Sequence, residues 1–476
     1  MGNLFTSLNS TSQSLQAFEQ AMDVVQNNVT NANSPGYADQ VPEMISQDFQ
    51  AGTGLSGGVQ ETTQDTRNSY ADTAVQQSMS LQGMYQQLQT SLEPLESVFD
   101  VSSSSPIPSA LNQLFQSFSQ WSSQPSNASY QSAVINAAQQ TATAFQQAAG
   151  ELNSIQTQTT SDIQSTVTQI NQDAATIQSY NVQIARNPTP DAGLSAQLES
   201  TLENLSSLTN VTTIPGLGGM VTVLIGGQTP LVIGTQVNDL QAVNDTTSNA
   251  GNPGAPPTIS IVDSNGNDIT GQVTSGSLAG LLNVSNTMLP ALIGGGQQVG
   301  GLNTLAQGLA DSINNVLAQA STTSTPPYQA GSPLFTYNSS SPAGIAGSLA
   351  VSSTITGSLL AAADTGPPVV ANGAALTLAG LDSSNPGPID GQGFTQYFSS
   401  MTSAVGNAVS NANTAETAQS QLVAQAQSLQ QQVSGVSLDE EAVRLVQLQG
   451  SYDAASKVVT EINQTLQTLM EMIPTD

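Results

Sequence analysis

The chain has 476 residues, no cysteine and no histidine, and its 33 acidic and 4 basic residues give a formal charge of −29. The missing side chains exclude disulfides, thiolate metal sites and histidine-based acid–base catalysis. Binding to nucleic acid or to anionic membranes is disfavoured, because both require clustered lysine and arginine. No apolar run approaches the length of a membrane span.

The N-terminal residues 3–32 predict an amphipathic helix. The spacing of its apolar residues alternates between three and four, which places them along one stripe: Leu8, Leu15, Phe18, Met22, Val25 and Val29. The turn at 33–36 ends this helix, because Pro35 disfavours helical geometry in the residue before it and Gly36 tolerates a positive φ. The segment lacks the basic and apolar regions of a cleaved signal peptide, so any export is expected to occur without one.

The rest of the first half is predicted to be mainly helical. Residues 41–66 show no helical period and contain several glycines, so an extended, loop-like segment is expected there. Helical spacing then predicts helices over about 70–99, 111–121, 130–186 and 194–208, with Pro94 as a candidate kink in the first of them.

The character of the sequence changes at Val211. Short β-type runs lie at 221–225, 231–233 and 258–262, between turns rich in glycine, proline and asparagine. Helical spacing returns at 277–320 and at 401–433. Between those segments, residues 321–395 are rich in small residues and carry a weak strand signal at 376–378.

The last forty residues carry the longer of the two apolar stripes. Only Glu441 interrupts it, and its members are Leu438, Leu445, Leu448, Tyr452, Ala455, Val459, Ile462, Leu466, Leu469 and Ile473. Two helices alone bury little area. We therefore expect the terminal helices to pair with each other and to pack against neighbouring copies. The acidic residues 439–441 are interpreted as the first turn of the last helix, capped by Ser437.

The order of these segments predicts a mainly α fold with β insertions and several discontinuous domains. Paired N- and C-terminal coiled-coil helices, a helical-bundle middle domain and β-rich outer domains are expected. The predicted domains are 1–40 with 434–476 for the coiled coil, 41–208 with 277–325 and 396–433 for the bundle, 209–276 for a β-rich outer domain, and 326–395 for a second β or irregular outer segment.

Three segments invite a chemical interpretation, and a structural one is favoured for each. Residues 263–268 superficially resemble a calcium loop, but the glycine and glutamate positions do not fit an EF-hand, which favours an Asn-Gly turn. The glycines at 216–219 and 294–296 lack the Lys-Ser/Thr of a phosphate-binding loop. No catalytic, cofactor-binding or metal-binding residue is therefore predicted.

Two stretches resemble the flagellar rod, hook and hook-associated protein family. The first contains Asn27, Asn28, Asn31, Asn33, Pro35, Gly36 and Tyr37. The second is similar to the form found in hook-associated members and contains Ser434, Gly435, Val436, Leu438, Asp439 and Glu440. Where the family commonly has Arg-Gln after the tyrosine, this chain has Ala38-Asp39-Gln40. Glu199 and Glu203 stand where an Arg-Asp pair is typical.

This resemblance implies an extracellular, non-enzymatic structural subunit that joins the flagellar hook to the filament. It implies export through the flagellar type III apparatus, with the terminal helices forming an inner tube by helical self-assembly. The implied partners are copies of the chain itself, the hook protein, a second junction protein or the filament, and an export chaperone on the C-terminal helix. A rod or hook subunit, or an acidic secreted adhesin or coat protein, is the alternative.

Overall fold

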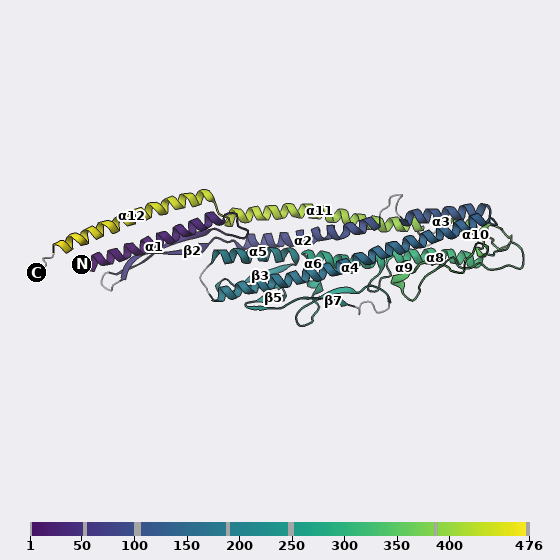
Figure 1. The fold of residues 1–476 in the computed structure, drawn as a ribbon, viewed down its shortest axis with the longest axis horizontal. Coiled ribbons are helices and arrows are strands. Elements are labelled where there is room, and N and C mark those ends of the chain that lie inside the picture. The colour runs from purple at the N-terminus through teal and green to yellow at the C-terminus, as the bar shows by residue number, and fades with distance from the viewer. Residues whose placement is uncertain are drawn as a thin grey trace.

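The two ends of the chain form a narrow arm that projects from a longer helical body (Figure 1). This architecture is that of a computed structural model, which describes residues 2–50, 55–99, 106–186, 191–245, 252–384, 387 and 389–472. The fold is mainly helical with small β-sheets, as predicted. The boundaries of the domains stay a prediction.

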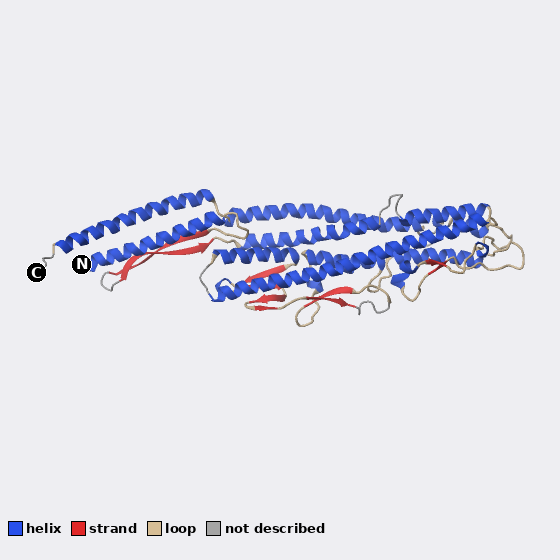
Figure 2. Cartoon of the chain, in the orientation of Figure 1, coloured by secondary structure: helices blue, strands red, loops and turns tan. Residues whose placement is uncertain are grey.

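The arm consists of two helices and a β-hairpin (Figure 2). The hairpin lies against α1 and pairs Gln40 with Asp65 and Gln50 with Leu55. The prediction of an extended segment is confirmed, but its loop-like character was wrong, because the two strands pair with each other. A side chain at Gly58 would meet Gln13 and Ser10 of α1, so this glycine marks a close backbone approach and not a loop. The elements are α1 (Gly2–Asn31), β1 (Gln40–Gln50), β2 (Leu55–Asp65) and α12 (Leu438–Glu471).

Long helices give the body its length. The antiparallel pair α2 and α11 runs away from the arm and back, with Gln430 Nε2 donating to Asp72 Oδ1 and Gln419 Nε2 to the Ser78 carbonyl. Pro94 lies inside α2 without ending it. The helices of this layer are α2 (Ser69–Val98), α3 (Pro106–Ser123), the 59-residue α4 (Ala128–Arg186), α5 (Ala192–Leu208) and α11 (Phe394–Ser434).

Two small antiparallel sheets cover the half of α4 nearer the arm, and the predicted β runs lie in them. Asn181 of α4 is fully buried and donates Nδ2 to the carbonyls of Val221 and Gly234, at 2.8 and 2.7 Å. Ile163, Ile170 and Ile177 form the core beneath the sheets. The strands are β3 (Val211–Pro215), β4 (Val221–Ile225), β5 (Thr229–Ile233) and β6 (Gln236–Val237) in one sheet, and β7 (Gln241–Asp245) with β8 (Thr258–Val262) in the other.

The far end of the body holds the largest core, around Trp121, Phe118 and Phe145. Described residues of the segment 321–393, among them Leu334, Leu349 and Leu360, pack into this core. The strand signal at 376–378 was wrong, because Ala374, Ala375 and Leu378 bury one face of a short helix. The elements here are the π-helical turn η4 (Val284–Met288), α7 (Leu289–Ile293), α8 (Gly301–Gln319), β9 (Phe335–Thr336), α9 (Ile345–Ser348), β10 (Ala350–Val351) and α10 (Gly373–Ala379). The preceding helix α6 (Ser277–Asn283) instead belongs to the core beneath the sheets.

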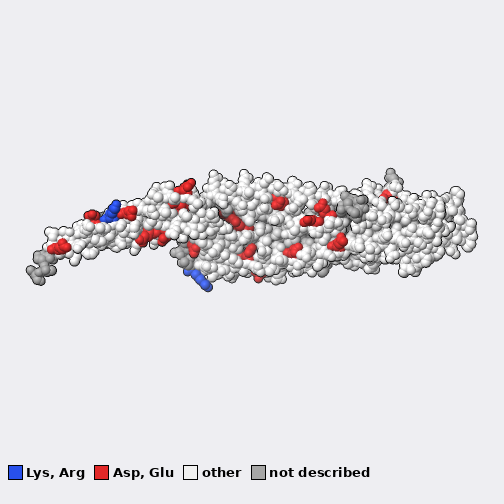
Figure 3. All heavy atoms as spheres, turned by 45° about the horizontal axis from the view of Figure 1, so that its top comes forward, with Lys and Arg blue, Asp and Glu red and all other residues white. Residues whose placement is uncertain are grey.

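The charges are unevenly distributed over this shape. On the face drawn in Figure 3, acidic side chains lie on the arm and the middle of the body, whereas the end far from the termini carries none. The sequence agrees, since residues 101–150 contain no charged residue. Among the described helices, none is long and apolar enough to cross a bilayer.

Candidate assembly interface

The two terminal helices pack antiparallel along the arm. Asn28 of α1 meets Glu441 near the start of α12, and Glu19 meets Tyr452 nearer its middle, with Tyr452 Oη donating to Glu19 Oε1 at 3.1 Å. The pairing of the N- and C-terminal helices is therefore present within one chain.

On α1, the buried line runs through small residues beside the predicted stripe. Ala17, Ala21, Val25 and Asn28 are buried, because α12 covers one side of the helix and the hairpin covers another. The remaining predicted positions lie around this line: Leu8, Leu15, Phe18 and Met22 are half-buried, and Val29 is exposed.

On α12, the predicted stripe faces α1, but α1 covers it only partly. Within α12, the buried residue is Glu441. Leu445, Leu448, Tyr452, Ala455, Val459, Ile462 and Leu466 are half-buried, Leu438 and Leu469 are exposed, and Ile473 lies outside the described residues. Val443 and Val446 add further apolar surface, with 59% and 67% of each residue exposed. Much of the apolar surface of α12 thus remains open to solvent.

Glu441, which interrupts the apolar stripe, is the centre of a polar lock between the two helices. It is 1% exposed, and its Oε2 accepts from Asn28 Nδ2 at 3.0 Å, while Arg444 Nη1 pairs with its Oε1. Asn28 is fully buried. Its amide group also lies 2.7 Å from Asp39 Oδ1 and 2.8 Å from the Gln40 carbonyl, and its Oδ1 accepts from Tyr37 Oη at 2.9 Å. A buried polar group among apolar positions favours one register of a coiled coil.

Burial dominates the electrostatics of the lock. It raises the pKa of Asp39 and of Glu441, and the cation of Arg444 opposes both shifts. The pKa of Tyr37 is raised to about 12, first by burial and then by the nearby carboxylates of Asp39, Asp65 and Glu441. Tyr37 therefore stays protonated and donates to Asn28 throughout the physiological range.

The N-terminal signature residues build the turn after α1. Asn31 accepts from Ser34 Oγ at 3.1 Å, and Asn27, Asn33 and Pro35 are exposed. Gly36 has φ 72°, and a Cβ there would lie 2.5 Å from the Ala196 carbonyl oxygen of α5. Glycine is required because of both the left-handed backbone and the close approach.

The C-terminal signature residues build the connection from α11 to α12. Ser434 accepts twice: its Oγ from the Asn68 amide at 3.0 Å, and its carbonyl from the Asp39 amide at 2.8 Å. After Gly435 and the half-buried Val436, Ser437 caps α12 by accepting from the Glu440 amide, as predicted. Asp439 and Glu440 are exposed in the first helical turn, where carboxylates are favourable.

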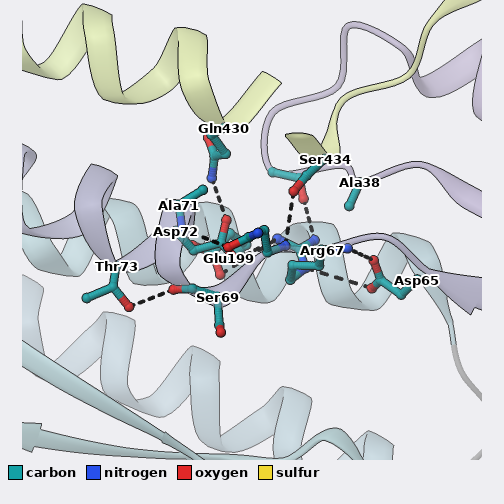
Figure 4. A network of polar contacts seen from close by, with 12 residues as sticks. Ala38, Asp65, Arg67, Ser69, Ala71, Asp72, Thr73, Glu199, Gln430 and Ser434 are labelled. Carbon is teal, nitrogen blue, oxygen red and sulfur yellow. Dashed lines mark hydrogen bonds and ion pairs between the residues drawn. The ribbon is translucent and has the colours of Figure 1, made fainter. Parts of the chain in front are cut away.

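A second polar cluster, which the sequence did not reveal, lies where the arm meets the body. We call it the joint cluster and define it as Arg67, Asp72, Glu199, Glu203 and Gln430. Figure 4 shows how Arg67, Asp72, Glu199 and Gln430 lie relative to one another. The members of the cluster come from the β2–α2 link, α2, α5 and α11. The available signal was the pair of glutamates four residues apart on α5, which face the same side of that helix.

Within the described parts of the chain, the acidic side chains do not gather into a metal site. Among the described residues, no group of three or more acidic side chains is arranged to hold an ion. At 263–268, Asp263 Oδ1 accepts from the amides of Asn265 and Asn267 at 2.9 and 2.8 Å, and Gly266 has φ 82°. The interpretation of this segment as a turn is confirmed.

Comparison with known proteins yields two matches to family sequence models. The flagellar hook-associated protein FlgK helical domain matches residues 92–335, more than half of the chain. The C-terminal region of the flagellar basal body rod FlgEFG proteins matches residues 427–472, which contain the end of α11 and all of α12.

Whole-chain comparisons agree with these matches. Flagellar hook-associated protein 1 of Bacillus subtilis (strain 168) is 26% identical over 97% of this chain and 96% of its own length. The structure of the flagellar hook junction protein FlgK from Burkholderia pseudomallei has a similar fold, with a TM-score of 0.64 and 16% identity over 76% of this chain and 100% of that one. The chain thus belongs to the FlgK family of flagellar hook-associated proteins, which are structural adaptors of the bacterial flagellum.

Proposed function

We propose that this protein joins the flagellar hook to the filament, and that it does so by helical self-assembly through α1 and α12. The observation that carries this proposal is the incomplete burial of α12, whose apolar residues are half-buried against α1 and exposed elsewhere. Apolar surface of this extent on a helix is typical of a protein–protein contact. Neighbouring copies would cover it.

The same surface supports the proposed partners. Hook subunits would lie on one side of a ring of copies, and a second junction protein or the filament on the other. Before assembly, an export chaperone would cover α12, because its apolar side chains are otherwise open to solvent. The similarity to a junction protein and a hook-associated protein supports this location.

An extracellular location and a purely structural role belong to the same proposal. Export as an unfolded chain, without a cleaved signal, suits a protein without cysteine, since no disulfide could obstruct its passage. Absence of catalysis suits a chain that also has no histidine.

Truncation of residues 437–476 tests the assembly mechanism. We expect the truncated protein to remain folded in its body, to lose self-assembly, and to leave cells non-motile when it replaces the full chain. A gentler variant, Val443→Asn with Val446→Asn, should weaken self-assembly without changing the melting temperature of the monomer. Gln447→Asn with Gln449→Asn is the matched control on the same helix. Normal filaments in the truncated strain would contradict the proposal.

The match of residues 427–472 to rod proteins keeps a rod or hook subunit as a second candidate. A deletion strain distinguishes the two. Hooks that carry no filaments support a junction protein, whereas cells without hooks support a rod or hook subunit. A normal flagellum would leave only a function outside this class, such as a secreted adhesin.

A further inference from the structure

Arm and body meet at a joint where three connecting segments contact one another: the turn after α1, the link from β2 to α2, and the connection from α11 to α12. The Asp39 amide donates to the Ser434 carbonyl, and the Asn68 amide donates to Ser434 Oγ. Arg67 Nη2 donates to the Gly36 carbonyl at 2.7 Å. The guanidinium of Arg67 therefore ties the turn after α1 to the start of α2 and places one positive charge at the joint.

The acidic groups around this cation outnumber it. The guanidinium of Arg67 lies 3.8 Å from Asp65, 3.9 Å from Asp72 and 3.8 Å from Glu199. The Arg67 backbone amide also donates to Asp65 Oδ1 at 2.8 Å. Glu203 adds another carboxylate, since Gln430 Nε2 donates to both Asp72 and Glu203, at 2.7 and 3.3 Å. When Asp65, Asp72, Glu199 and Glu203 are all ionised, their negative charges outnumber the single positive charge of Arg67.

Glu199 is one of the two buried carboxylates of the joint cluster, the other being Asp72. It is 6% exposed and accepts one hydrogen bond, from Gln76 Nε2 at 3.0 Å. The charged groups that face it are Asp72, Arg67 and Glu203, with Asp65 on the far side of Arg67. The lock, on the arm side of the joint, contains the other nearby charged groups, Asp39, Glu441 and Arg444.

We propose that Glu199 makes the joint between arm and body sensitive to protons: the joint closes firmly when Glu199 is protonated and loosens when Glu199 is ionised. Protonation removes one of the excess negative charges and leaves Arg67 with Asp65, Asp72 and the Gly36 carbonyl. A cavity of about 500 Å³ lined by Arg67, Asp72, Gln76 and Glu199 lies beside the cluster, so that protons can reach Glu199 from solvent. This inference does not depend on the proposed function.

The direction of the pH dependence follows from the environment of Glu199. Burial, followed by the charge of Asp72, raises its pKa from 4.5 to about 7, against the opposing effect of Arg67. Because the pKa is higher in the folded joint than in the unfolded chain, the stabilisation is fully present below pH 4.5 and is lost as the pH rises through about 7. Burial raises the pKa values of Asp72 and Glu203 as well, which reinforces the same direction.

Hydrogen exchange of the full chain between pH 6 and pH 8 tests the proposal. The readout is the protection of peptides over residues 36–40 and 66–70, corrected for the intrinsic exchange rate, relative to a peptide from 130–150, which contains no charged residue. We expect this relative protection to fall about tenfold between pH 6 and pH 8, since one pKa unit corresponds to a factor of ten in an equilibrium constant.

Two variants assign the effect to Glu199. Glu199→Gln should keep the protection high at both pH values, whereas Glu151→Gln, an exposed glutamate on α4, should behave as the parent protein. Asp72→Asn should move the midpoint to lower pH, because it removes a charge that raises the pKa of Glu199. A pH-independent relative protection in the parent protein, or an unchanged pH dependence in Glu199→Gln, would overturn the proposal.

Discussion

The body and the arm are held together by different kinds of contact. The body buries large apolar side chains on several sides, with Trp121, Phe118 and Phe145 completely enclosed. The arm buries small residues, Ala17 and Ala21, and closes on the polar pair of Asn28 and Glu441. Apolar burial is strong but non-directional, whereas a buried hydrogen-bonded pair contributes little net stability and specifies one arrangement.

We therefore expect the body to account for most of the stability of the chain, and the polar contacts of the arm to determine the register of α1 against α12. The body has its core within one chain, so we expect it to fold and remain folded alone. In the arm, the lock defines the register of α1 against α12 within one chain. Much of the apolar surface of α12, however, is open to solvent. Four substitutions test this division, in order of decreasing expected effect.

Phe118→Ala should lower the free energy of unfolding by about 3–5 kcal/mol, because it leaves a cavity in the largest core. Urea unfolding of the full chain, followed by the far-UV circular dichroism of the body, measures this loss. The neighbouring Ser119→Ala, at an exposed position, should stay within about 0.5 kcal/mol of the parent. Equal effects of the two substitutions would mean that the body does not depend on this core.

Gly36→Ala should destabilise the joint by about 3 kcal/mol, at the upper end for backbone strain, because a clash with Ala196 adds to the positive φ. Hydrogen exchange in residues 36–40 reports the change without averaging over the body. Gly150→Ala is the matched control, since nothing lies within 4 Å of a Cβ there. It should be neutral or stabilise α4 by up to about 1 kcal/mol.

Asn28→Ala should destabilise the pairing of α1 with α12 by about 2 kcal/mol, because the buried carboxylate of Glu441 loses its amide donor. The expected signature is faster exchange in both terminal helices with unchanged exchange in α4. Asn27→Ala, one residue away and exposed, should change neither. If both variants behave alike, the lock does not hold the arm.

Ile462→Ala should have the smallest effect on a single chain, about 1 kcal/mol, because its side chain is only half-buried against α1. Sedimentation of concentrated protein should show a larger loss in self-assembly, where neighbouring copies are proposed to cover this residue. A purely intrachain role predicts the same loss in both measurements.

The sequence predicted elements well where one periodicity extends over many residues. The long helix at 130–186 and both terminal helices lie close to their expected limits, because each carries one continuous apolar stripe. Short segments were harder. Residues 376–378 alternate apolar and polar side chains over too few positions to separate strand from helix, and only the packing of Ala374 and Ala375 decides between them.

The polar contacts of the joint cluster and of the lock could not be predicted from the sequence, for a different reason. Glu441 looked like an interruption of a stripe, because its partner Asn28 lies more than 400 residues away in the sequence. Nothing in the sequence singles out Asp72, and Glu199 stands out there only as a departure from the family pattern. Such contacts depend on which helices meet in the folded chain and on the residues at which they meet. Neither property produces a periodic pattern in the local sequence.

The single helix α4 has a mechanical consequence. With 59 residues it spans roughly 90 Å at about 1.5 Å per residue, and it contributes Phe145 and Leu152 to one core and Ile163 and Ile170 to the other. The body therefore behaves as one stiff beam, since bending it would disturb a continuous helix and two packed cores together. Under the torque of a rotating flagellum, strain would concentrate where this beam ends, at the short segments that connect it to the arm.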